Sequence, residues 1–194
     1  MQRMKLKDII DKFISGDWGQ EMPGDDSTNA VYCVRGADIV PIANTSYDDI
    51  PQRFITNKSF TNRLLNAGDL VIEKSGGSPT QSTGRISYVS SDLISKKSKI
   101  VCSNFCVAFR VKKERWNPKF IYYYWQHIYH QGVFFNFEGK TSGLKNLQLD
   151  NALAAIDVPE ISLAEQSSIV DCLDRISDKI ALNREINRNL ALSA

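Results

Sequence analysis

The strongest structural signal in the chain is the segment Gly68-Asp69-Leu70-Val71-Ile72-Glu73-Lys74-Ser75-Gly76-Gly77-Ser78-Pro79-Thr80-Gln81-Ser82-Thr83-Gly84-Arg85. Its apolar run, Leu70 to Ile72, predicts a strand, and the Gly, Ser, Thr, Gln and Pro residues that follow predict a loop. Glycines permit close backbone approach, and short polar side chains offer donors and acceptors without bulk. Lys74 and Arg85, at the two ends of the loop, suit phosphate groups. The segment therefore predicts a loop that contacts a polyanion, with a solvated hairpin as the plainer alternative.

Outside this segment, the sequence predicts further strands at residues 31–34, 54–55, 85–89 and 99–111, and helices at residues 4–15 and 120–131. Residues 4–15 carry apolar side chains at helical spacing. Residues 99–111 alternate between apolar and polar as a strand does, although Ser103 interrupts the apolar face. Pro118 stands where a first helical turn begins. These elements predict an α+β domain with a mixed or antiparallel sheet.

The C-terminal segment has a different character, because Gly and Pro are absent from residue 163 to residue 192. Apolar residues and two asparagines recur there at alternating steps of four and three, which is the heptad pattern of a coiled coil. The members of this heptad seam are Ile169, Leu173, Ile176, Ile180, Asn183, Asn187 and Leu190. A lone helix leaves such a seam in water, so we expect a partner helix; docking of the seam on the chain's own domain is the alternative.

Five motifs occur in order along nearly the whole chain: Ser15-Gly16-Asp17-Trp18-Gly19, Val34-Arg35-Gly36-Ala37-Asp38-Ile39, the segment at residues 68–85, Thr141-Ser142-Gly143-Leu144-Lys145-Asn146-Leu147, and Val158-Pro159-Glu160-Ile161-Ser162-Leu163-Ala164-Glu165-Gln166. Together they closely resemble the target-recognition domains of Type I restriction–modification specificity subunits. A complete subunit of that family has two such domains, braced by two antiparallel conserved helices. Each domain reads half of a split DNA site, and the helices fix the spacing and bind the methyltransferase subunits.

The resemblance implies that this chain corresponds to half of that plan, with a target-recognition domain at residues 1–158 and a conserved helix at residues 159–194. Three alternatives stay open for the chain: a natural half-subunit, a truncated product or an expressed fragment. We expect its partners to be double-stranded DNA, the methyltransferase (modification) and restriction subunits, and either a second copy or a second conserved helix. S-adenosylmethionine, ATP and Mg²⁺ are expected on the partner subunits, with no cofactor or metal in this chain.

The candidate DNA contacts fall into three classes. Phosphate-neutralising cations are Lys74, Arg85, Lys140 and Lys145, and the glycines that let the loop enter a groove are Gly76, Gly77 and Gly84. Side chains expected to reach base edges are Ser75, Ser78, Gln81, Ser82 and Thr83, with Arg35 and Asn146 as further candidates. For Arg35, a structural ion pair with Asp38 remains an equal alternative.

Several catalytic patterns are incomplete. Gly139-Lys140-Thr141 lacks the first glycine of a phosphate-binding loop, and Asn117-Pro118-Lys119-Phe120 lacks the second proline of the amino-methyltransferase motif. Glu73 and Lys74 are adjacent, so on a strand they point to opposite faces and do not form a nuclease metal site with Asp69. The spacing of two cysteines and two histidines does not fit a zinc finger. We therefore expect a binding protein and not an enzyme.

Two alternatives stay open. The chain could be the recognition part of a combined methyltransferase–nuclease, or a structural coiled-coil interaction module.

Residues 58–119 carry twelve Lys and Arg against four Asp and Glu, which is a modest nucleic-acid signature in a chain of net charge +2. No apolar run approaches the roughly 20 residues that a membrane span needs, and the four scattered cysteines fit a reducing compartment. We therefore expect a cytoplasmic protein.

Overall fold

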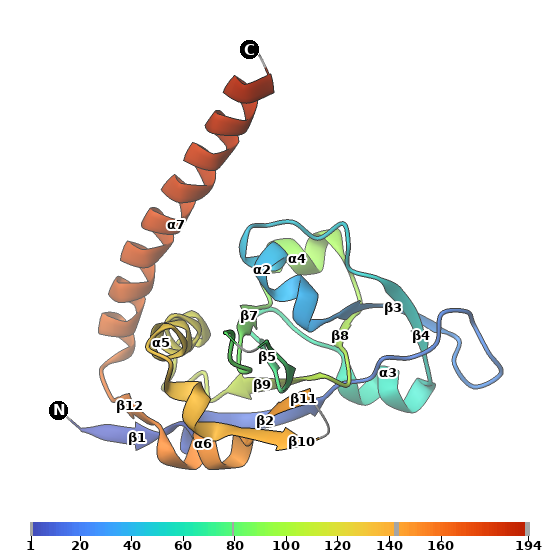
Figure 1. Ribbon diagram of the computed structural model, residues 1–194, viewed down its shortest axis with the longest axis horizontal. Coiled ribbons are helices and arrows are strands. Elements are labelled where there is room, and N and C mark those ends of the chain that lie inside the picture. Colours follow the sequence, from blue (N-terminus) through green and yellow to red (C-terminus); the bar gives the residue numbers. More distant parts are fainter. Residues whose placement is uncertain (1, 79, 142–143, 193–194) are drawn as a thin grey trace.

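The computed structural model describes residues 2–78, 80–141 and 144–192. A body of strands and short helices carries one long helix, α7 (Leu163–Leu192), which extends away from it (Figure 1). The prediction of an α+β fold followed by a long C-terminal helix is confirmed. No helix within the described ranges is long and apolar enough to cross a membrane.

The centre of the body is a four-stranded antiparallel sheet in the order β2 (Ile10–Ser15), β9 (Cys106–Val111), β5 (Leu70–Glu73) and β7 (Ile86–Tyr88). A three-stranded sheet has the order β4 (Gln52–Ile55), β3 (Asn29–Val34) and β8 (Ile100–Cys102), and its β3–β8 pair is parallel. The prediction of mixed and antiparallel sheets is thereby confirmed. The four residues of β5 are all buried because the central sheet is covered on both faces.

Helix α5 (Pro118–His130) covers one face of the central sheet, where Trp125 packs on Phe109 with ring centroids 6.0 Å apart. The other face packs on the three-stranded sheet through Val71 and Val34. Around these layers lie the shorter helical elements α1 (Leu6–Ile9), η1 (Gly36–Asp38), α2 (Ile39–Ala43), α3 (Asn57–Arg63), α4 (Ser91–Lys96), η2 (Val133–Phe137) and α6 (Leu149–Ala155).

Two small sheets complete the body. One joins β1 (Arg3–Lys5) to β12 (Asp157–Pro159), so that the first strand leads back to the base of α7. The other has the order β10 (Glu138–Thr141), β11 (Leu144–Leu147) and β6 (Ser75–Gly76). Through β6, the loop that follows β5 becomes part of a sheet formed by residues about seventy positions later in the chain, Lys145 pairing with Gly76.

The prediction of a single helix at residues 4–15 is wrong. The segment is β1, then the short helix α1, then β2. Along β2, Ile14 is buried and Phe13 is exposed, because successive side chains of a strand point to opposite faces. Pairing of β2 with β9 along the edge of the central sheet outweighs the helical spacing of the apolar residues.

The prediction of one strand at residues 99–111 is also wrong. The segment is divided into β8 and β9, which belong to different sheets. A tight turn at Ser103, Asn104 and Phe105 separates them and is closed by the Cys106 amide, which donates to the Ser103 carbonyl over 2.9 Å. The polar residue that interrupts the apolar alternation, Ser103, marks the position of this turn.

Helix α7 is fastened to the body at its first turns. The Glu165 amide donates to Ser162 Oγ and the Ser162 amide to Glu165 Oε2, which is a reciprocal cap. Gln166 is fully buried, and its side chain accepts from the Asn117 amide and donates to the Arg115 carbonyl. About two turns later, Asp174 accepts from Lys119 and Tyr123 of α5.

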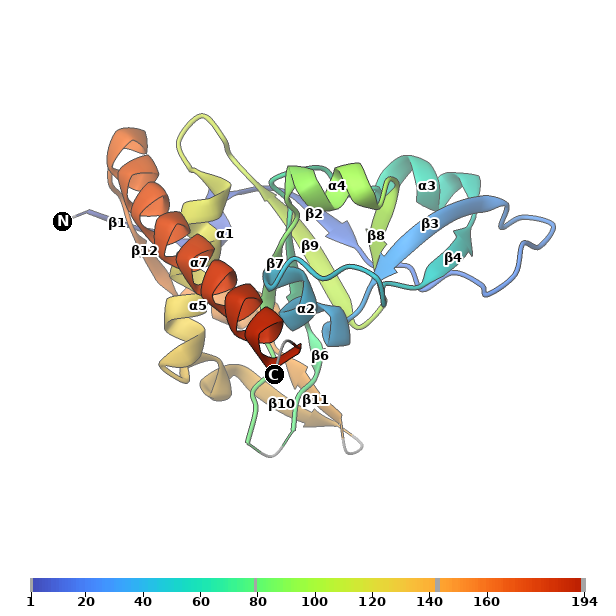
Figure 2. The ribbon, with the colours of Figure 1, turned by 90° about the horizontal axis from the view of Figure 1, so that it is seen from above.

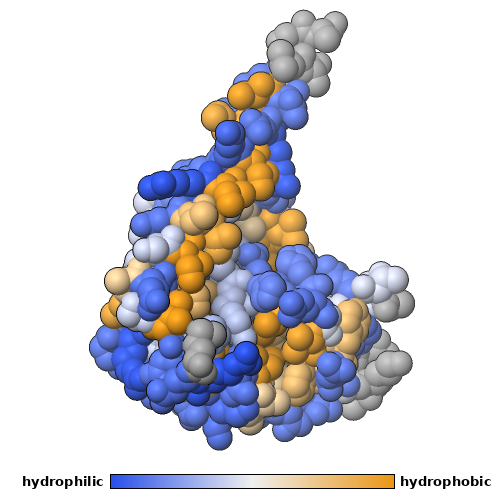
Figure 3. Space-filling model, turned by 90° about the vertical axis from the view of Figure 1, so that its left-hand side faces the viewer, coloured by the Kyte–Doolittle hydropathy of each residue, from blue (hydrophilic) through white to orange (hydrophobic). Residues whose placement is uncertain are grey.

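Most of the heptad seam stays exposed beside this attachment, although Leu173 is half-buried and Ile180 lines a hollow that α7 shares with α5. The exposed fractions of Ile169, Ile176 and Ile180 are 40%, 52% and 47%. Figure 3 shows apolar residues following the length of the helix as it leaves the body. The seam therefore docks on the chain's own domain only in part. The side chain of Leu190 lies outside the described part of the helix.

Candidate nucleic-acid interface

The C-terminal half of the 74–85 loop is built into the body. Arg85 donates to both carboxylate oxygens of Glu73 over 2.8 and 2.6 Å, and the two side chains are only 17% and 4% exposed. This hydrogen bonding raises the pKa of the Arg85 guanidinium above its ordinary value. Trp125 Nε1 donates to the Gly84 carbonyl and the Tyr129 hydroxyl to the Ser82 carbonyl, over 2.7 and 3.0 Å. The loop therefore rests on α5 and is not a freely solvated hairpin along its whole length.

The tip of the loop, residues 77–78 and 80–81, faces outward. Ser78 and Gln81 exchange two backbone hydrogen bonds of 3.0 and 3.2 Å, and the Gln81 amide also lies 3.1 Å from Ser78 Oγ. Gly77 has a φ of +76°, and a Cβ there would lie 2.8 Å from the Gln81 carbonyl oxygen. Only glycine fits this turn without strain. The Gln81 side chain is consequently presented on a fixed backbone.

The β10–β11 hairpin supports the same loop from the side (Figure 2). Ser75 Oγ donates to Asn146 Oδ1 over 2.5 Å. Glu138 accepts from the Thr83 amide over 2.7 Å and forms an ion pair of 3.0 Å with Lys145. The Glu138 carboxylate thus connects the 74–85 loop to the β10–β11 hairpin. Residues 142–143 and the side chain of Lys140 lie outside the described part of the structure.

The structure changes the expected roles of several candidate residues. Ser82, Thr83 and Gly84 are buried beneath the tip, so we remove them from the set that reaches DNA. The cations of Arg85 and Lys145 are held by the buried carboxylates Glu73 and Glu138, because a buried carboxylate needs a partner. Their expected role as free phosphate neutralisers is therefore corrected to one in holding the loop.

Arg35 also has a structural role. Its guanidinium donates to both oxygens of Asp38 over 2.9 and 2.8 Å and to the Asp49 carbonyl over 2.8 Å. The bonds to Asp38 raise the pKa of Arg35. Of the two alternatives for this residue, the structure contains the ion pair. The guanidinium is committed to these oxygens in the free protein.

The residues that remain for contact with an external polyanion are few and adjacent. Lys74, Gly77 and Gln81 are exposed, while Ser75, Gly76 and Ser78 are half-buried. Thr80 is exposed at the tip as well, although the sequence did not single it out. Lys74 takes part in no ion pair with the described residues, so it carries an uncompensated positive charge at the start of the loop. One cation beside a polar tip is a suitable arrangement for the edge of a nucleic acid groove.

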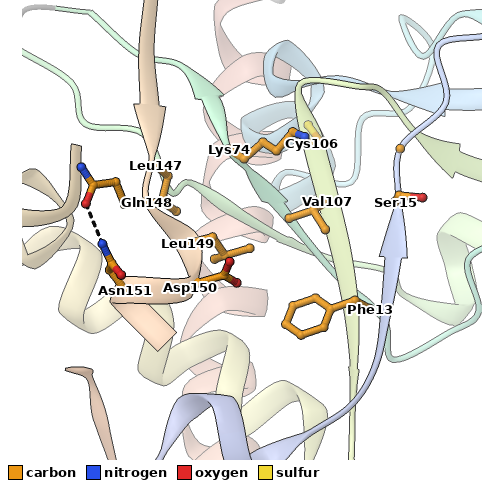
Figure 4. Close-up of a pocket in the computed structure, with 11 residues that line it drawn as sticks. Phe13, Ser15, Lys74, Cys106, Val107, Leu147, Gln148, Leu149, Asp150 and Asn151 are labelled. Atoms are coloured by element: carbon orange, nitrogen blue, oxygen red, sulfur yellow. Dashed lines mark hydrogen bonds between the residues drawn. The ribbon is translucent and has the colours of Figure 1, made fainter. Parts of the chain in front are cut away.

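A cavity of about 590 Å³ lies below the loop, between the edge of the central sheet and α6. In Figure 4, Phe13 and Val107 form its apolar side, and Leu147, Gln148 and Asn151 line the opposite side. Asn151 Nδ2 donates to Gln148 Oε1 over 2.8 Å. Lys74, at the start of the loop, also lines the cavity, whereas none of the tip residues does.

The residues that form the incomplete catalytic patterns have other partners. Arg110 donates to both oxygens of Asp69 over 2.8 Å, and Glu73 is paired with Arg85. In the zinc-like pattern, burial raises the pKa of the Cys102 thiol and raises that of the Cys106 thiol to about 11, so both remain protonated at neutral pH. These carboxylates and thiols therefore serve the packing of the body.

Sequence reasoning missed the turn between β8 and β9 as part of this surface. Phe105 is 55% exposed, and its carbonyl accepts from the amides of Lys74 and Ser75 over 2.9 and 3.1 Å. Trp18 lies beside the same turn, because its amide donates to Asn104 Oδ1 over 3.2 Å. The only sequence signal for this arrangement is the interruption at Ser103.

The family model of the Type I restriction modification DNA specificity domain matches residues 1–192. The solved structures that are similar to the chain include three with TM-scores from 0.57 to 0.63. They are a chain from a study of "complex assembly and conformational transition of the type I R-M system" (TM-score 0.63, 17% identity), the HsdS subunit from Thermoanaerobacter tengcongensis (0.62, 16%) and the Type-I restriction-modification system S subunit from M. genitalium (0.57, 14%).

The matches cover 99%, 99% and 97% of this chain but only 42%, 45% and 43% of the respective solved chains. This chain therefore spans less than half the length of the structures that it matches. At such identities the likeness concerns the fold. The chain has no significant match among curated proteins.

Proposed function

The chain belongs to the family of Type I restriction modification DNA specificity domains, and from this premise we propose that it reads one half of a split double-stranded DNA site. The observation that carries the proposal is the construction of the 74–85 loop. Its tip is exposed and polar, while its base is held by α5, by the β10–β11 hairpin and by the Glu73–Arg85 pair. A rigid scaffold under an exposed loop is suited to recognition, because little conformational freedom is lost on binding.

Within this surface we propose separate roles for charge and for shape. Lys74 neutralises a phosphate and fixes the register of the domain on the duplex. Gln81 offers both a donor and an acceptor to a base edge, and Ser78 offers a hydroxyl. Glycines 76 and 77 let the backbone approach the groove. Lys140 and Asn146 remain candidates on the neighbouring hairpin.

The exposed heptad seam of α7 supports a second proposal about assembly. Ile169, Ile176 and Ile180 are each at least 40% exposed, and such a row of apolar side chains is stabilised by a partner helix. We propose that the partner is the α7 of a second copy or a second conserved helix of the same kind. Pairing would join two half-site readers at a fixed distance.

The proposed chemistry belongs to other subunits. The chain would dock the methyltransferase and restriction subunits, which would carry S-adenosylmethionine, ATP and Mg²⁺. The pairing of Asp69 with Arg110 and of Glu73 with Arg85 supports a binding role, because both carboxylates already serve internal guanidinium groups. A combined methyltransferase–nuclease, with its catalytic part elsewhere, would use the same reading surface.

Selection from a random duplex library tests the proposal. The chain would be assembled with its methyltransferase subunits, and bound duplexes would be recovered and sequenced over several rounds. We expect enrichment of one short half-site, repeated at a fixed spacing. The matched control is the Gln81→Ala chain in the same assembly, which should relax one position of the selected sequence. Failure of the unmodified assembly to enrich any sequence would contradict the proposal.

A further inference from the structure

A second feature of the candidate surface is an apolar recess beside the 74–85 loop. It has a volume of about 380 Å³ and is lined by Trp18, Arg35, Gly36, Ser103, Asn104 and Phe105. We refer to it as the Trp18–Phe105 recess. Two aromatic side chains from separate segments, the end of the β2 segment and the β8–β9 turn, contribute to its lining.

The backbone around the recess is held firmly. The Asp17 amide donates to the Cys102 carbonyl over 2.7 Å, and the Trp18 amide to Asn104 Oδ1 over 3.2 Å. Gly16 lies so close to the turn that a Cβ there would be 1.9 Å from the Ser103 carbonyl oxygen. The Arg53 guanidinium lies 4.2 Å from the centre of the Trp18 ring. The exposed Phe105 ring is consequently carried by a fixed turn, although exposure of a large apolar side chain costs stability.

The charged groups near the recess are already neutralised. Arg35 is paired with Asp38, and Arg53 forms an ion pair of 3.4 Å with Glu21. The recess therefore does not attract a phosphate, which requires free cations. An uncharged and partly apolar group is a better occupant.

One polar group in the lining lacks a good partner. Ser103 is 1% exposed, and its Oγ forms no hydrogen bond with the described residues. Its hydroxyl opposes the rise in the pKa of the neighbouring Cys106 thiol, but a thiol is a weak partner. Because the oxygen is enclosed, this hydroxyl belongs to the packing beneath the recess, and the surface that the recess presents is mainly apolar.

The recess is continuous with the candidate DNA surface. The Phe105 carbonyl accepts from the amides of both Lys74 and Ser75, which fixes the recess to the start of the 74–85 loop. Of the base edges in the major groove, only thymine presents an apolar group, its 5-methyl, next to a carbonyl acceptor, O4. An apolar recess beside the 74–85 loop therefore suits the edge of a thymine.

We propose that the Trp18–Phe105 recess receives the 5-methyl group of a thymine in the major groove, so that Phe105 is a specificity-determining residue. The proposal rests on the proposed function, because it names one base edge that the same surface reads.

The test replaces thymine by deoxyuridine, which removes only the methyl group. The preferred half-site is first obtained from the selection above, and each of its thymines is then changed in turn. For the unmodified chain with its methyltransferase subunits, we expect one replacement to weaken binding about fourfold, which corresponds to roughly 0.8 kcal/mol for one buried CH₂ group. Because this step uses the unmodified protein, it does not depend on the folding of any variant.

The second step assigns the effect to the recess. Phe105→Ala should bind thymine and deoxyuridine duplexes equally well, with an unchanged thermal unfolding midpoint. The matched control is Phe13→Ala, which removes a ring of similar exposure (48%) from β2 outside the recess, and it should retain the fourfold discrimination.

Three results would overturn the inference while leaving the proposed function intact: a preferred half-site without thymine, no deoxyuridine effect at any position, or full discrimination in Phe105→Ala. Absence of any sequence preference in the unmodified assembly would instead overturn the proposed function itself. The two failures are thus distinguishable in one set of titrations.

Discussion

Lys74 and Arg85 stand at the two ends of one loop, yet their side chains have different environments. The Arg85 guanidinium holds the nearly buried carboxylate of Glu73, whereas Lys74 is exposed and takes part in no ion pair with the described residues. In the sequence, both residues have the same character, a cation beside a glycine-rich segment. Their separation into a structural and a surface cation depends on Glu73, whose side chain points into the interior from the last position of β5.

Arg85→Ala should therefore destabilise the fold. Its removal leaves Glu73 buried without a partner, and breaking a buried pair in this way costs about 3–5 kcal/mol. The free energy of unfolding in urea measures the effect. Lys74→Ala is the matched control and should change stability by less than about 0.5 kcal/mol, as exposed substitutions do. Equal stability of the two variants would show that the pair does not hold the loop.

The buried thiols give a second expectation at this scale. Burial raises the pKa of Cys33 to about 12 and that of Cys106 to about 11, while Cys172 is exposed on α7. Only thiolates react readily with alkylating reagents, so Cys172 should be modified first at pH 8. Because the folded pKa values are raised, the stability that these thiols contribute is present below about pH 9 and is lost as pH rises through 11–12. Mass spectrometry after brief alkylation checks the order, and early modification of Cys106 would contradict it.

At the scale of the element, a strong local sequence pattern was sufficient to predict some helices and strands. The strand β5 and the helix α5 lie where an apolar run and a helix-starting Pro118 predict them. The prediction of a helix at residues 4–15 is wrong because the apolar positions there are compatible with both the helical repeat and the two-residue repeat of a strand. Pairing of β2 with β9 selects the strand. Such pairing joins residues about one hundred positions apart, so no local pattern contains it.

The candidate site was likewise predictable from the sequence only in part. The polar composition of the 74–85 loop indicates a surface segment, and its tip is indeed exposed. Ser82 and Thr83 have the same polar character, but they are buried because the loop turns back over α5, where Tyr129 and Trp125 bind its carbonyl groups. Those two hydrogen bonds connect the loop to a helix more than forty positions away. The place of Phe105 beside the loop could not be predicted either, because the turn that carries Phe105 meets the loop only in the folded chain.

The heptad seam of α7 leads to an expectation about assembly. Changing Ile176 and Ile180 together to Asp would place unpaired charges in an apolar seam, which prevents helix pairing without touching the attachment to α5. We expect a folded monomer, measured by sedimentation velocity and circular dichroism. Ser168→Asp is the control, because it adds a charge at an exposed position outside the seam and should leave assembly unchanged.

The unmodified chain should sediment as a dimer, or capture a second conserved helix supplied as a peptide. If it remains monomeric at high micromolar concentration and captures no such helix, the seam has another role. That result would remove the proposal of helix pairing and would leave the reading surface untouched.

At the scale of the whole molecule, the two proposed activities lie on separate parts of the chain. The reading surface is carried by the sheets of the body, and the pairing surface by the free length of α7 (Figure 1). The isolated chain should therefore transfer no methyl group from labelled S-adenosylmethionine and should cleave no plasmid DNA. Methyl transfer that copurifies with the chain alone, and is lost in a Gln81→Ala variant of equal purity, would contradict a purely recognising role.

The central claim is that the tip of the 74–85 loop reads DNA, and one set of binding titrations tests it most directly. The chain, assembled with its methyltransferase subunits, would be titrated with the selected duplex and a scrambled duplex at several salt concentrations. Lys74→Ala should weaken binding to both duplexes and lower the salt slope by about one unit, because one phosphate contact is lost. Gln81→Ala should cost roughly 1–3 kcal/mol on the selected duplex only. Unchanged affinity of both variants for both duplexes would contradict the claim.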